Sequence, residues 1–105
     1  MRRSLTALAM LAACALAHAQ DAAAGKARAA ACTVCHGPLG IAVAPDTPNL
    51  AGQPESYLAA QLKAYRGGAR QHEIMSLMAR PLTDADIANL AAWFASLKVE
   101  ATAPK

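Results

Sequence analysis

The segment Cys32-Thr33-Val34-Cys35-His36 constrains this chain more than any other stretch. Two cysteines separated by two residues lie on one turn of helix, so both sulfurs can form thioethers with the two vinyl groups on one edge of a porphyrin. His36 follows directly and is placed under the ring as an iron ligand. The motif therefore predicts covalently attached haem c, held by Cys32 and Cys35 and bound at its iron by His36.

The same cysteine spacing also occurs in redox dithiols and in half-sites for zinc. A structural zinc site usually needs about four ligands. The chain after residue 19 offers neither a second cysteine pair nor a closely spaced histidine pair. A thioredoxin-like site would sit beside a β-strand, and no convincing strand flanks the motif. Both alternatives therefore fit the sequence poorly.

The first 19 residues have the pattern of a secretory signal peptide. A basic start at Met1-Arg2-Arg3 precedes an apolar run over residues 4–17, and Ala17-His18-Ala19 forms a small-x-small cleavage site. The run is too short for a comfortable membrane span. We therefore expect cleavage before Gln20, export to the periplasm and a mature domain of residues 20–105.

A second interpretation of the leader concerns Cys14. Leu11-Ala12-Ala13-Cys14 resembles the lipobox at which bacterial lipoproteins are cleaved and lipidated. Cleavage there would leave a rather short apolar region before Cys14 and an apolar stretch after it. Soluble export is favoured over a lipid anchor at Cys14 because the A-x-A site is present.

The charge of the mature chain gives no reason to expect a nucleic-acid partner. Loss of Arg2 and Arg3 leaves 8 Lys and Arg against 7 Asp and Glu, a net charge of +1 before two haem propionates are added. No basic stripe with interleaved aromatic residues is visible. A mature chain this small can build only a small core, and a buried macrocycle would enlarge it. Its aromatic residues are Tyr57, Tyr65, Trp93 and Phe94.

The sequence predicts an all-α fold with about three main helices. An alanine-rich stretch over residues 21–35 predicts a helix that runs straight into the cysteine motif. Pro54 at a first helical position opens a second helix over residues 55–66, which Gly67-Gly68 ends. Thr83-Asp84-Ala85-Asp86 is a near capping box, and apolar residues at helical spacing follow it to Leu97.

Gly25 is unusual within the first of these helices. It either marks a frayed first turn or gives the last helix room to cross closely. Trp93 and Phe94 are the bulky residues of the last helix that could meet the small Ala/Gly surface of the first.

Two irregular segments separate the expected helices. Residues 37–53 are rich in Gly and Pro and predict a loop that wraps one face of the haem. Pro45 in this loop either places its carbonyl oxygen on the Nδ1 proton of His36 or simply forms a turn. Residues 69–81 form the second loop, where a sixth iron ligand must originate. His72, Met75 and Met78 are its candidates.

Taken together, these features resemble a class I cytochrome c, and within that class the bacterial cytochrome c4 and c553 group. The resemblance runs through nearly the whole mature chain. The residues that carry it are Gly25, Cys32-Thr33-Val34-Cys35-His36-Gly37, Pro45, Pro48-Asn49-Leu50-Ala51-Gly52-Gln53, Tyr57-Leu58, Gln61-Leu62, Arg66-Gly67-Gly68, Ile74-Met75, Met78-Ala79-Arg80-Pro81-Leu82, Asp86-Ile87 and Ala92-Trp93-Phe94.

The resemblance implies a class I cytochrome c fold, with long loops wrapped around one covalent haem. It implies thioethers at Cys32 and Cys35, a proximal ligand at His36 and a distal ligand at Met75. The family's distal methionine lies six residues before the proline of a Pro-Leu pair, and Met75 holds that place relative to Pro81. Cytochrome c4 proteins typically carry two such domains, whereas this chain has one CxxCH, so it resembles a single half. A homodimer is therefore left open.

The expected function is periplasmic electron transfer without substrate chemistry. The expected partners are a membrane-bound electron donor and a terminal oxidase or reductase, which dock transiently at the exposed haem edge. Two alternatives remain. A labile sixth ligand would make the protein a haem enzyme or a sensor of gases or peroxide, and Arg70 and His72 lie in the relevant loop. The domain could also be the haem subunit of a larger dehydrogenase or oxidase complex.

Overall fold

The computed structural model describes residues 20–105. These residues form helices and loops without a β-strand, which confirms the all-α fold expected for this part of the chain. The expected signal peptide, including Cys14, lies outside the described residues. Within them, no helix is both long and apolar enough to cross a bilayer. The elements are α1 (Ala22–Arg28), the 3₁₀ turn η1 (Ala29–Ala31), α2 (Thr33–His36), α3 (Glu55–Gly67), α4 (Met75–Ala79) and α5 (Asp84–Ser96).

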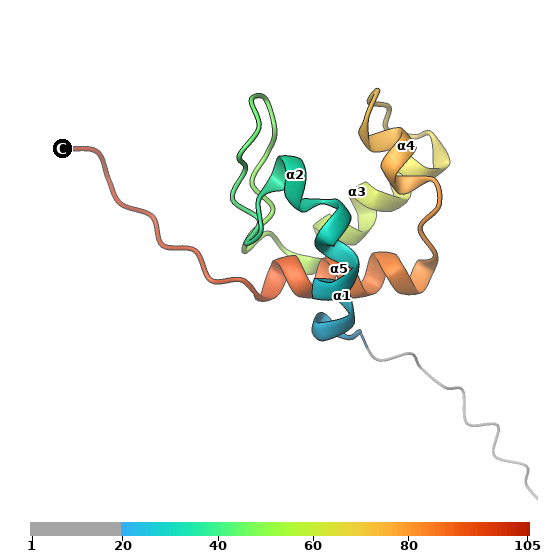
Figure 1. The fold of residues 1–105 in the computed structure, drawn as a ribbon, viewed down its shortest axis with the longest axis horizontal. Helices are drawn as coiled ribbons and strands as arrows, with labels where there is room; N and C mark the ends of the chain where they lie inside the picture. The colour runs from blue at the N-terminus through green and yellow to red at the C-terminus, as the bar shows by residue number, and fades with distance from the viewer. Residues whose placement is uncertain (1–19) are drawn as a thin grey trace, which may run out of the picture.

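Helix α1 crosses α5 at Gly25 (Figure 1). A Cβ atom on residue 25 would overlap the carbonyl oxygen of Asn89 and would lie 2.9 Å from Cβ of Trp93. Only glycine leaves room for the two backbones to approach this closely. Of the two interpretations that the sequence left open, the structure shows the close crossing.

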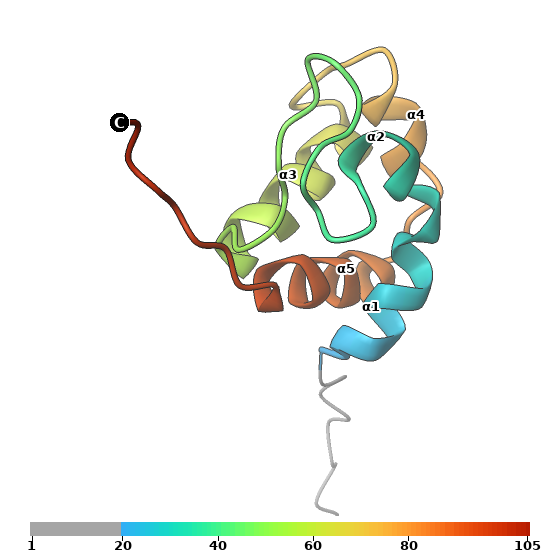
Figure 2. The same cartoon turned by 60° about the vertical axis from the view of Figure 1, so that its left-hand side comes forward.

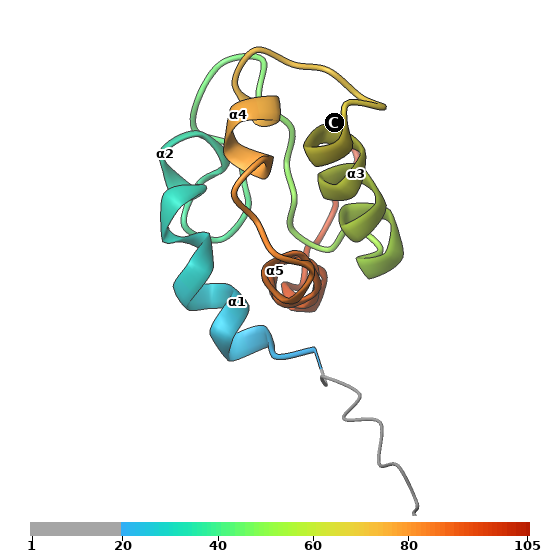
Figure 3. The same cartoon turned by 90° about the vertical axis from the view of Figure 1, so that its right-hand side faces the viewer.

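The buried core lies on α5, with α1 and α3 on either side of it (Figure 3). Ala29 of η1 and Leu58 of α3 join this core, in one cluster with Phe94 of α5. The expected contact of Trp93 with the small surface of α1 is present at Gly25. Leu90 and Ala91 complete the buried cluster.

The helix expected over residues 21–35 is not continuous. Asp21 caps α1 by accepting hydrogen bonds from the backbone N–H groups of Ala23 and Ala24, but α1 ends at Arg28. The chain then tightens into η1, where the N–H of Cys32 donates to the carbonyl of Ala29 at 2.8 Å. Such 3₁₀ turns are common at helix ends. The cysteine motif therefore begins after a break in the helix.

The other expected boundaries are close to those observed. Pro54 is the residue before α3 rather than its first helical residue, a difference of one position. Gly68 ends α3 in the left-handed conformation, with φ of 86°. At α5 the capping box is present, because Thr83 and Asp86 each accept a hydrogen bond from the other's backbone N–H at 3.0 Å.

Residues 37–53 form the expected irregular loop, which runs from α2 towards α5, turns away from it and then returns to the end of α5 (Figure 2). Gly37 has a φ of 79°, and any side chain there would overlap the carbonyl of Ile41, so this turn requires glycine. The N–H of Gly52 donates to the carbonyl of Phe94 at 2.9 Å. The loop is therefore fastened to the core helix.

Residues 69–81 were expected to be a loop, and this expectation is wrong for their second half. Met75–Ala79 form the short helix α4. Ala79 is fully buried, whereas Leu77 is exposed, so the helix presents one side to the rest of the domain. Local hydrogen bonds at its start, described below, stabilise this single turn of helix.

Candidate haem-binding site

The cysteine motif folds into a compact turn. The carbonyl of Cys32 accepts hydrogen bonds from the N–H groups of Cys35 at 3.4 Å and His36 at 3.0 Å. Both cysteines are free and partly buried, and His36 is only 7% exposed. The structure thus brings the two thiols and the imidazole onto one short turn, as the motif predicted.

The His36 ring is oriented by a backbone carbonyl. Its Nδ1 lies 2.8 Å from the carbonyl oxygen of Pro48. A neutral imidazole that donates from Nδ1 keeps a lone pair on Nε2, which is the atom then available to a metal. The ring is therefore held in the tautomer that iron binding needs.

Of the two roles left open for Pro45, the structure contradicts that of partner to His36 and shows a turn at residues 45–46. The carbonyl beside His36 belongs to Pro48, whereas the carbonyl of Pro45 accepts a hydrogen bond from the Thr47 hydroxyl at 3.1 Å. Two prolines three residues apart offered two carbonyls to the same imidazole. The sequence pattern does not distinguish them, because the choice depends on how the loop folds back on itself.

That folding is set by hydrogen bonds across the loop. The carbonyl of Cys35 accepts from the N–H groups of Val43 and Ala44, at 3.0 and 3.2 Å. The Asn49 side chain accepts from the N–H of Ala42 at 2.7 Å. These bonds hold the middle of the loop against the motif and place residue 49 beside residue 42, and the Pro48 carbonyl next to Asn49 lies against the His36 ring. Asn49 is a supporting residue that the sequence reasoning did not single out, although it belongs to the Pro-Asn-Leu segment of the resemblance.

Burial raises the pKa of the Cys32 thiol, and the nearby charge of Arg28 opposes this only in part. Redox-active thiols in C-x-x-C motifs have lowered pKa values, because the thiolate is the reactive species. A thiol that burial keeps protonated does not match that pattern. The local environment of Cys32 therefore argues against the redox-dithiol interpretation.

The second segment of the candidate site is α4, which lies on the same side of α5 as α2 (Figures 1 and 3). Met75 at its first position is half-buried, and Met78 is 39% exposed. His72 is exposed, and its Nδ1 accepts hydrogen bonds from the backbone at the start of α4. Of the three candidate iron ligands, Met75 has the least exposed side chain.

Exposed apolar side chains are concentrated in these two segments. Of the nine large apolar residues most exposed in the described chain, seven lie within residues 34–43 or 74–78. Covering apolar surface stabilises a protein by about 25 cal/mol per Å². A flat apolar macrocycle attached at the motif would cover part of this surface and leave the rest exposed, so the surroundings fit the expected cofactor. The seven residues are Val34, Leu39, Ile41, Val43, Ile74, Leu77 and Met78.

No group of three or more His, Cys, Asp or Glu side chains within residues 20–105 could hold a bare metal ion. This finding also fits haem, in which the porphyrin supplies four of the ligands and the protein needs to add only the axial ones. The zinc interpretation of the cysteine pair has no further ligands nearby to support it.

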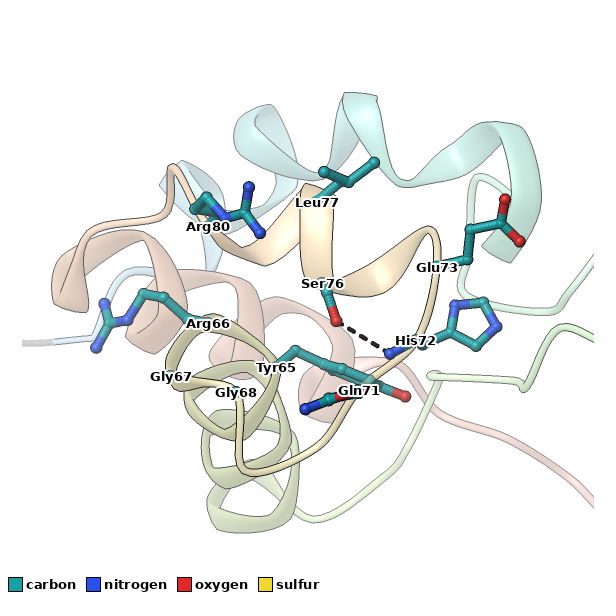
Figure 4. Close-up of a pocket in the computed structure, with 10 residues that line it drawn as sticks. All are labelled: Tyr65, Arg66, Gly67, Gly68, Gln71, His72, Glu73, Ser76, Leu77 and Arg80. Carbon is teal, nitrogen blue, oxygen red and sulfur yellow. Dashed lines mark hydrogen bonds between the residues drawn. The ribbon is translucent and has the colours of Figure 1, made fainter.

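A separate groove of about 700 Å³ lies between α3 and α4 (Figure 4). Cys32, Cys35 and His36 do not line it, but His72, Ser76 and Leu77 do, so it borders the candidate site on the α4 side. Its lining residues are Tyr65, Arg66, Gly67, Gly68, Gln71, His72, Glu73, Ser76, Leu77 and Arg80.

Comparison with known proteins identifies the family. The family model described as Cytochrome c matches residues 22–98. Cytochrome c-554(548) of Halomonas halodenitrificans is 46% identical over 81 residues, which cover 74% of this chain and 98% of that protein. Cytochrome c4 of Pseudomonas aeruginosa is 48% identical over 85 residues, which cover 80% of this chain but 42% of that protein.

Two further matches add to this picture. A protein of Thiomonas intermedia named thiosulfate dehydrogenase electron acceptor is 46% identical over 77 residues, covering 72% of this chain and 36% of that protein. The crystal structure of reduced recombinant cytochrome c4 from Pseudomonas stutzeri superimposes with a TM-score of 0.71 at 40% identity, covering 76% of this chain and 47% of that one. The chain thus spans nearly all of one relative and less than half of the others.

Proposed function

Since this chain belongs to the cytochrome c family, we propose that it is a one-electron carrier whose haem iron is held between His36 and Met75. Membership of this family means that the chain carries haem c and takes part in electron transfer. The observation that carries the proposal is the buried His36, directly after the cysteine pair, with its Nδ1 held by the Pro48 carbonyl.

The chain's own residues supply attachment and a fixed ligand. Cys32 and Cys35 retain the cofactor as thioethers, and His36 presents Nε2 to the iron. The bound haem supplies the ferric and ferrous states between which one electron is exchanged. A hydrogen bond from Nδ1 to a carbonyl orients the ring and raises its basicity, so the ligand keeps one geometry in both states. A ligand that does not move keeps reorganisation during electron transfer small.

Burial and bonding support Met75 as the distal ligand. The Met75 side chain is half-buried at the start of α4, and Met78 is more open to solvent. The Nδ1 lone pair of His72 is already used by two backbone N–H groups. A thioether opposite an imidazole raises the reduction potential of a c-type haem. This ligand pair suits a carrier, because a filled sixth position leaves no site for a substrate.

Exposed apolar residues beside the motif support transient docking at this face. Val34 is 79% exposed and Val43 is 66% exposed, and both lie close in sequence to the attachment residues. Small apolar contacts suit short-lived redox encounters. One relative is named as the electron acceptor of thiosulfate dehydrogenase. We therefore propose that this chain accepts electrons from a dehydrogenase and passes them to a terminal oxidase or reductase.

The proposed location is the periplasm, reached by the leader over residues 1–19. Intact mass spectrometry of the purified protein tests this directly. A mass that corresponds to residues 20–105 plus one haem supports cleavage before Gln20. A mass that corresponds to a lipidated chain beginning at Cys14 contradicts it and identifies a membrane anchor.

An absorption spectrum tests the ligand pair. The ferric protein should show the weak red to near-infrared band of Met-to-iron charge transfer, and carbon monoxide should leave the spectrum of the reduced protein unchanged. A missing band together with immediate carbon monoxide binding would contradict the carrier and favour the enzyme or sensor alternative. Both measurements use the intact holoprotein.

The substitution Met75→Ala should leave the haem attached but vacate the sixth position. We expect the charge-transfer band to disappear and carbon monoxide to bind the reduced variant. Met78→Ala on the same short helix is the matched control and should keep both properties of the parent. If Met78→Ala instead loses the band and Met75→Ala keeps it, the assignment of the distal ligand is wrong.

A further inference from the structure

His72 lies three residues before Met75, and its hydrogen bonds concentrate on the start of α4. Its Nδ1 lies 3.2 Å from the backbone nitrogen of Ile74 and 3.3 Å from that of Met75, so one lone pair accepts from two N–H groups. The carbonyl of His72 accepts from the N–H of Ser76 at 3.0 Å. The N–H groups of three successive residues at the start of this helix therefore all donate to His72.

Hydrogen bonds between His72 and Ser76 run in both directions, and Figure 4 shows one of the two. The backbone N–H of His72 donates to the Ser76 hydroxyl at 3.0 Å. An N-terminal box of this kind satisfies donors that a helix leaves without intrahelical partners. Ile74, the residue directly before the helix, makes no side-chain capping bond of its own. His72 thus caps the start of α4, although it lies two residues before Ile74, the usual capping position.

A cap matters more for α4 than for a longer helix. Helix α4 has five residues, and helices of this length do not persist in water on their own. Its first residue is Met75, whose sulfur sits at the end of a flexible side chain with three rotatable bonds. The position of that sulfur depends on the backbone from which it extends. Whatever fixes the first turn of α4 also fixes the ligand.

We propose that His72 is a positioning residue for the distal iron ligand, because its imidazole and backbone hold the first turn of α4 and with it Met75. This inference rests on the proposed ligation by Met75. His72 is not itself a ligand in this arrangement, because an Nδ1 that accepts from the backbone leaves the ring proton on Nε2, and neither nitrogen then offers the iron a free lone pair. Its role is to keep the sixth position closed by limiting how often Met75 leaves the iron.

The test compares His72→Ala with His72→Asn in the holoprotein. Alanine removes the side-chain acceptor, whereas asparagine keeps an oxygen that can accept from N–H groups two and three residues ahead. A side-chain cap of ordinary strength shifts an equilibrium about fivefold. His72→Ala should therefore bind added imidazole at the ferric iron about fivefold more tightly and should show a weaker charge-transfer band. His72→Asn should restore most of the parent values.

Two further variants sharpen the assignment. Ser76→Ala removes only the hydrogen bond from the N–H of His72 to the Ser76 hydroxyl. It should raise the imidazole affinity by less than His72→Ala does. Gln71→Ala, next to His72 in sequence and on the same groove, leaves all of these bonds in place and should match the parent. The amide protons of Ile74 and Met75 in the unmodified protein should exchange with solvent more slowly than those of the exposed tail over residues 101–105, because both are hydrogen-bonded, and this measurement needs no substitution.

The outcomes separate the two proposals. If the parent protein lacks a Met75-dependent charge-transfer band, the ligand assignment fails first. If the band is present and His72→Ala keeps the parent's imidazole affinity and band, only the positioning role is overturned. Equal effects of His72→Ala and His72→Asn would also overturn it, since the capping acceptor would then not be what matters. Exchange of the Ile74 and Met75 amides that is as fast as exchange in the exposed tail would also overturn the positioning role.

Discussion

The two sides of the candidate haem site are held by different kinds of contact. On the proximal side, His36 is 7% exposed, and its ring is fixed by the carbonyl of Pro48, 12 residues away in the sequence. On the distal side, the bonds that hold the start of α4 join His72 to residues no more than four positions away, and most of them are exposed. The proposed proximal ligand therefore depends on the whole fold, and the proposed distal ligand depends on one turn.

This difference has a thermodynamic meaning. Local segments can open with free energies well below that of global unfolding, and exposed hydrogen bonds with few buried contacts mark such segments. Loss of the His36 contact requires the loop and the core helix to separate, because the N–H of Gly52 is bonded to Phe94 of α5. Release of Met75 requires only that α4 fray. Ligand exchange at the iron should therefore occur from the distal side without unfolding.

Gly25→Ala should have the largest effect, because it acts on the crossing of α1 and α5 from which the proximal side extends. The added Cβ would overlap the carbonyl of Asn89, so the helices must move apart. Overpacking of this kind costs about 3 kcal/mol. Guanidinium unfolding of the holoprotein measures the loss. Ala27→Ser, on an exposed position of the same helix, should change stability by only a few tenths of a kcal/mol.

If Gly25→Ala were as stable to guanidinium as Ala27→Ser, the crossing of α1 and α5 would not stabilise the proximal side. The charge-transfer band offers a second check. Below the unfolding transition it should persist in Gly25→Ala, since α4 does not take part in the crossing. A variant that lost the band while still folded would show that the two sides are coupled more tightly than their contacts indicate.

The same contrast explains what the sequence could and could not predict. The single turn at the cysteine motif, the capping box and the apolar spacing of α5 are local patterns, and the structure shows each of them. The Gly25 crossing was one of two open interpretations, because a close approach is visible only when the partner helix is known. The His36 partner was assigned to Pro45 instead of Pro48, since loop closure involves bonds such as the one from Ala42 to Asn49.

The helix α4 was missed for a related reason. Five residues are too few for helical spacing to be recognised, and the cap comes from a histidine, which is not among the usual capping residues. A histidine three residues before a methionine therefore reads as a rival ligand in the sequence. Only the geometry shows that it supports the methionine.

Thr83→Ala should have an intermediate effect. The Thr83 hydroxyl accepts a hydrogen bond from the N–H of Asp86 at the start of α5, and removal of such a cap costs about 1 kcal/mol. Thr83→Ser keeps the hydroxyl and serves as the control. Because α5 carries the core, we expect the loss in global unfolding, measured in guanidinium, and little change in imidazole binding at the iron. A larger change in imidazole binding than in stability would place this cap with the distal side instead.

Acid should produce the smallest effect, and it acts where α5 begins. The backbone N–H of Thr83 holds the pKa of Asp86 below its ordinary value, with a smaller contribution from Arg28, and the Arg66 guanidinium does the same for Asp84. A carboxylate with a lowered folded-state pKa adds stability above its unfolded pKa of about 3.9, and this stability is lost as the pH falls through the folded-state value.

The measurement is the free energy of unfolding of the parent and of Asp86→Asn, taken at several pH values from about 6 down to about 2.5. The parent should be the more stable protein near pH 6, and the difference should shrink below about pH 4 as Asp86 is protonated. A difference that stays constant with pH would contradict the ionic part of the cap. Arg66 also donates to the carbonyl of Leu82 at 3.0 Å, between α4 and α5. Because its partner Asp84 loses charge as the pH falls through its lowered pKa, acid should weaken this connection between α3 and the start of α5 as well.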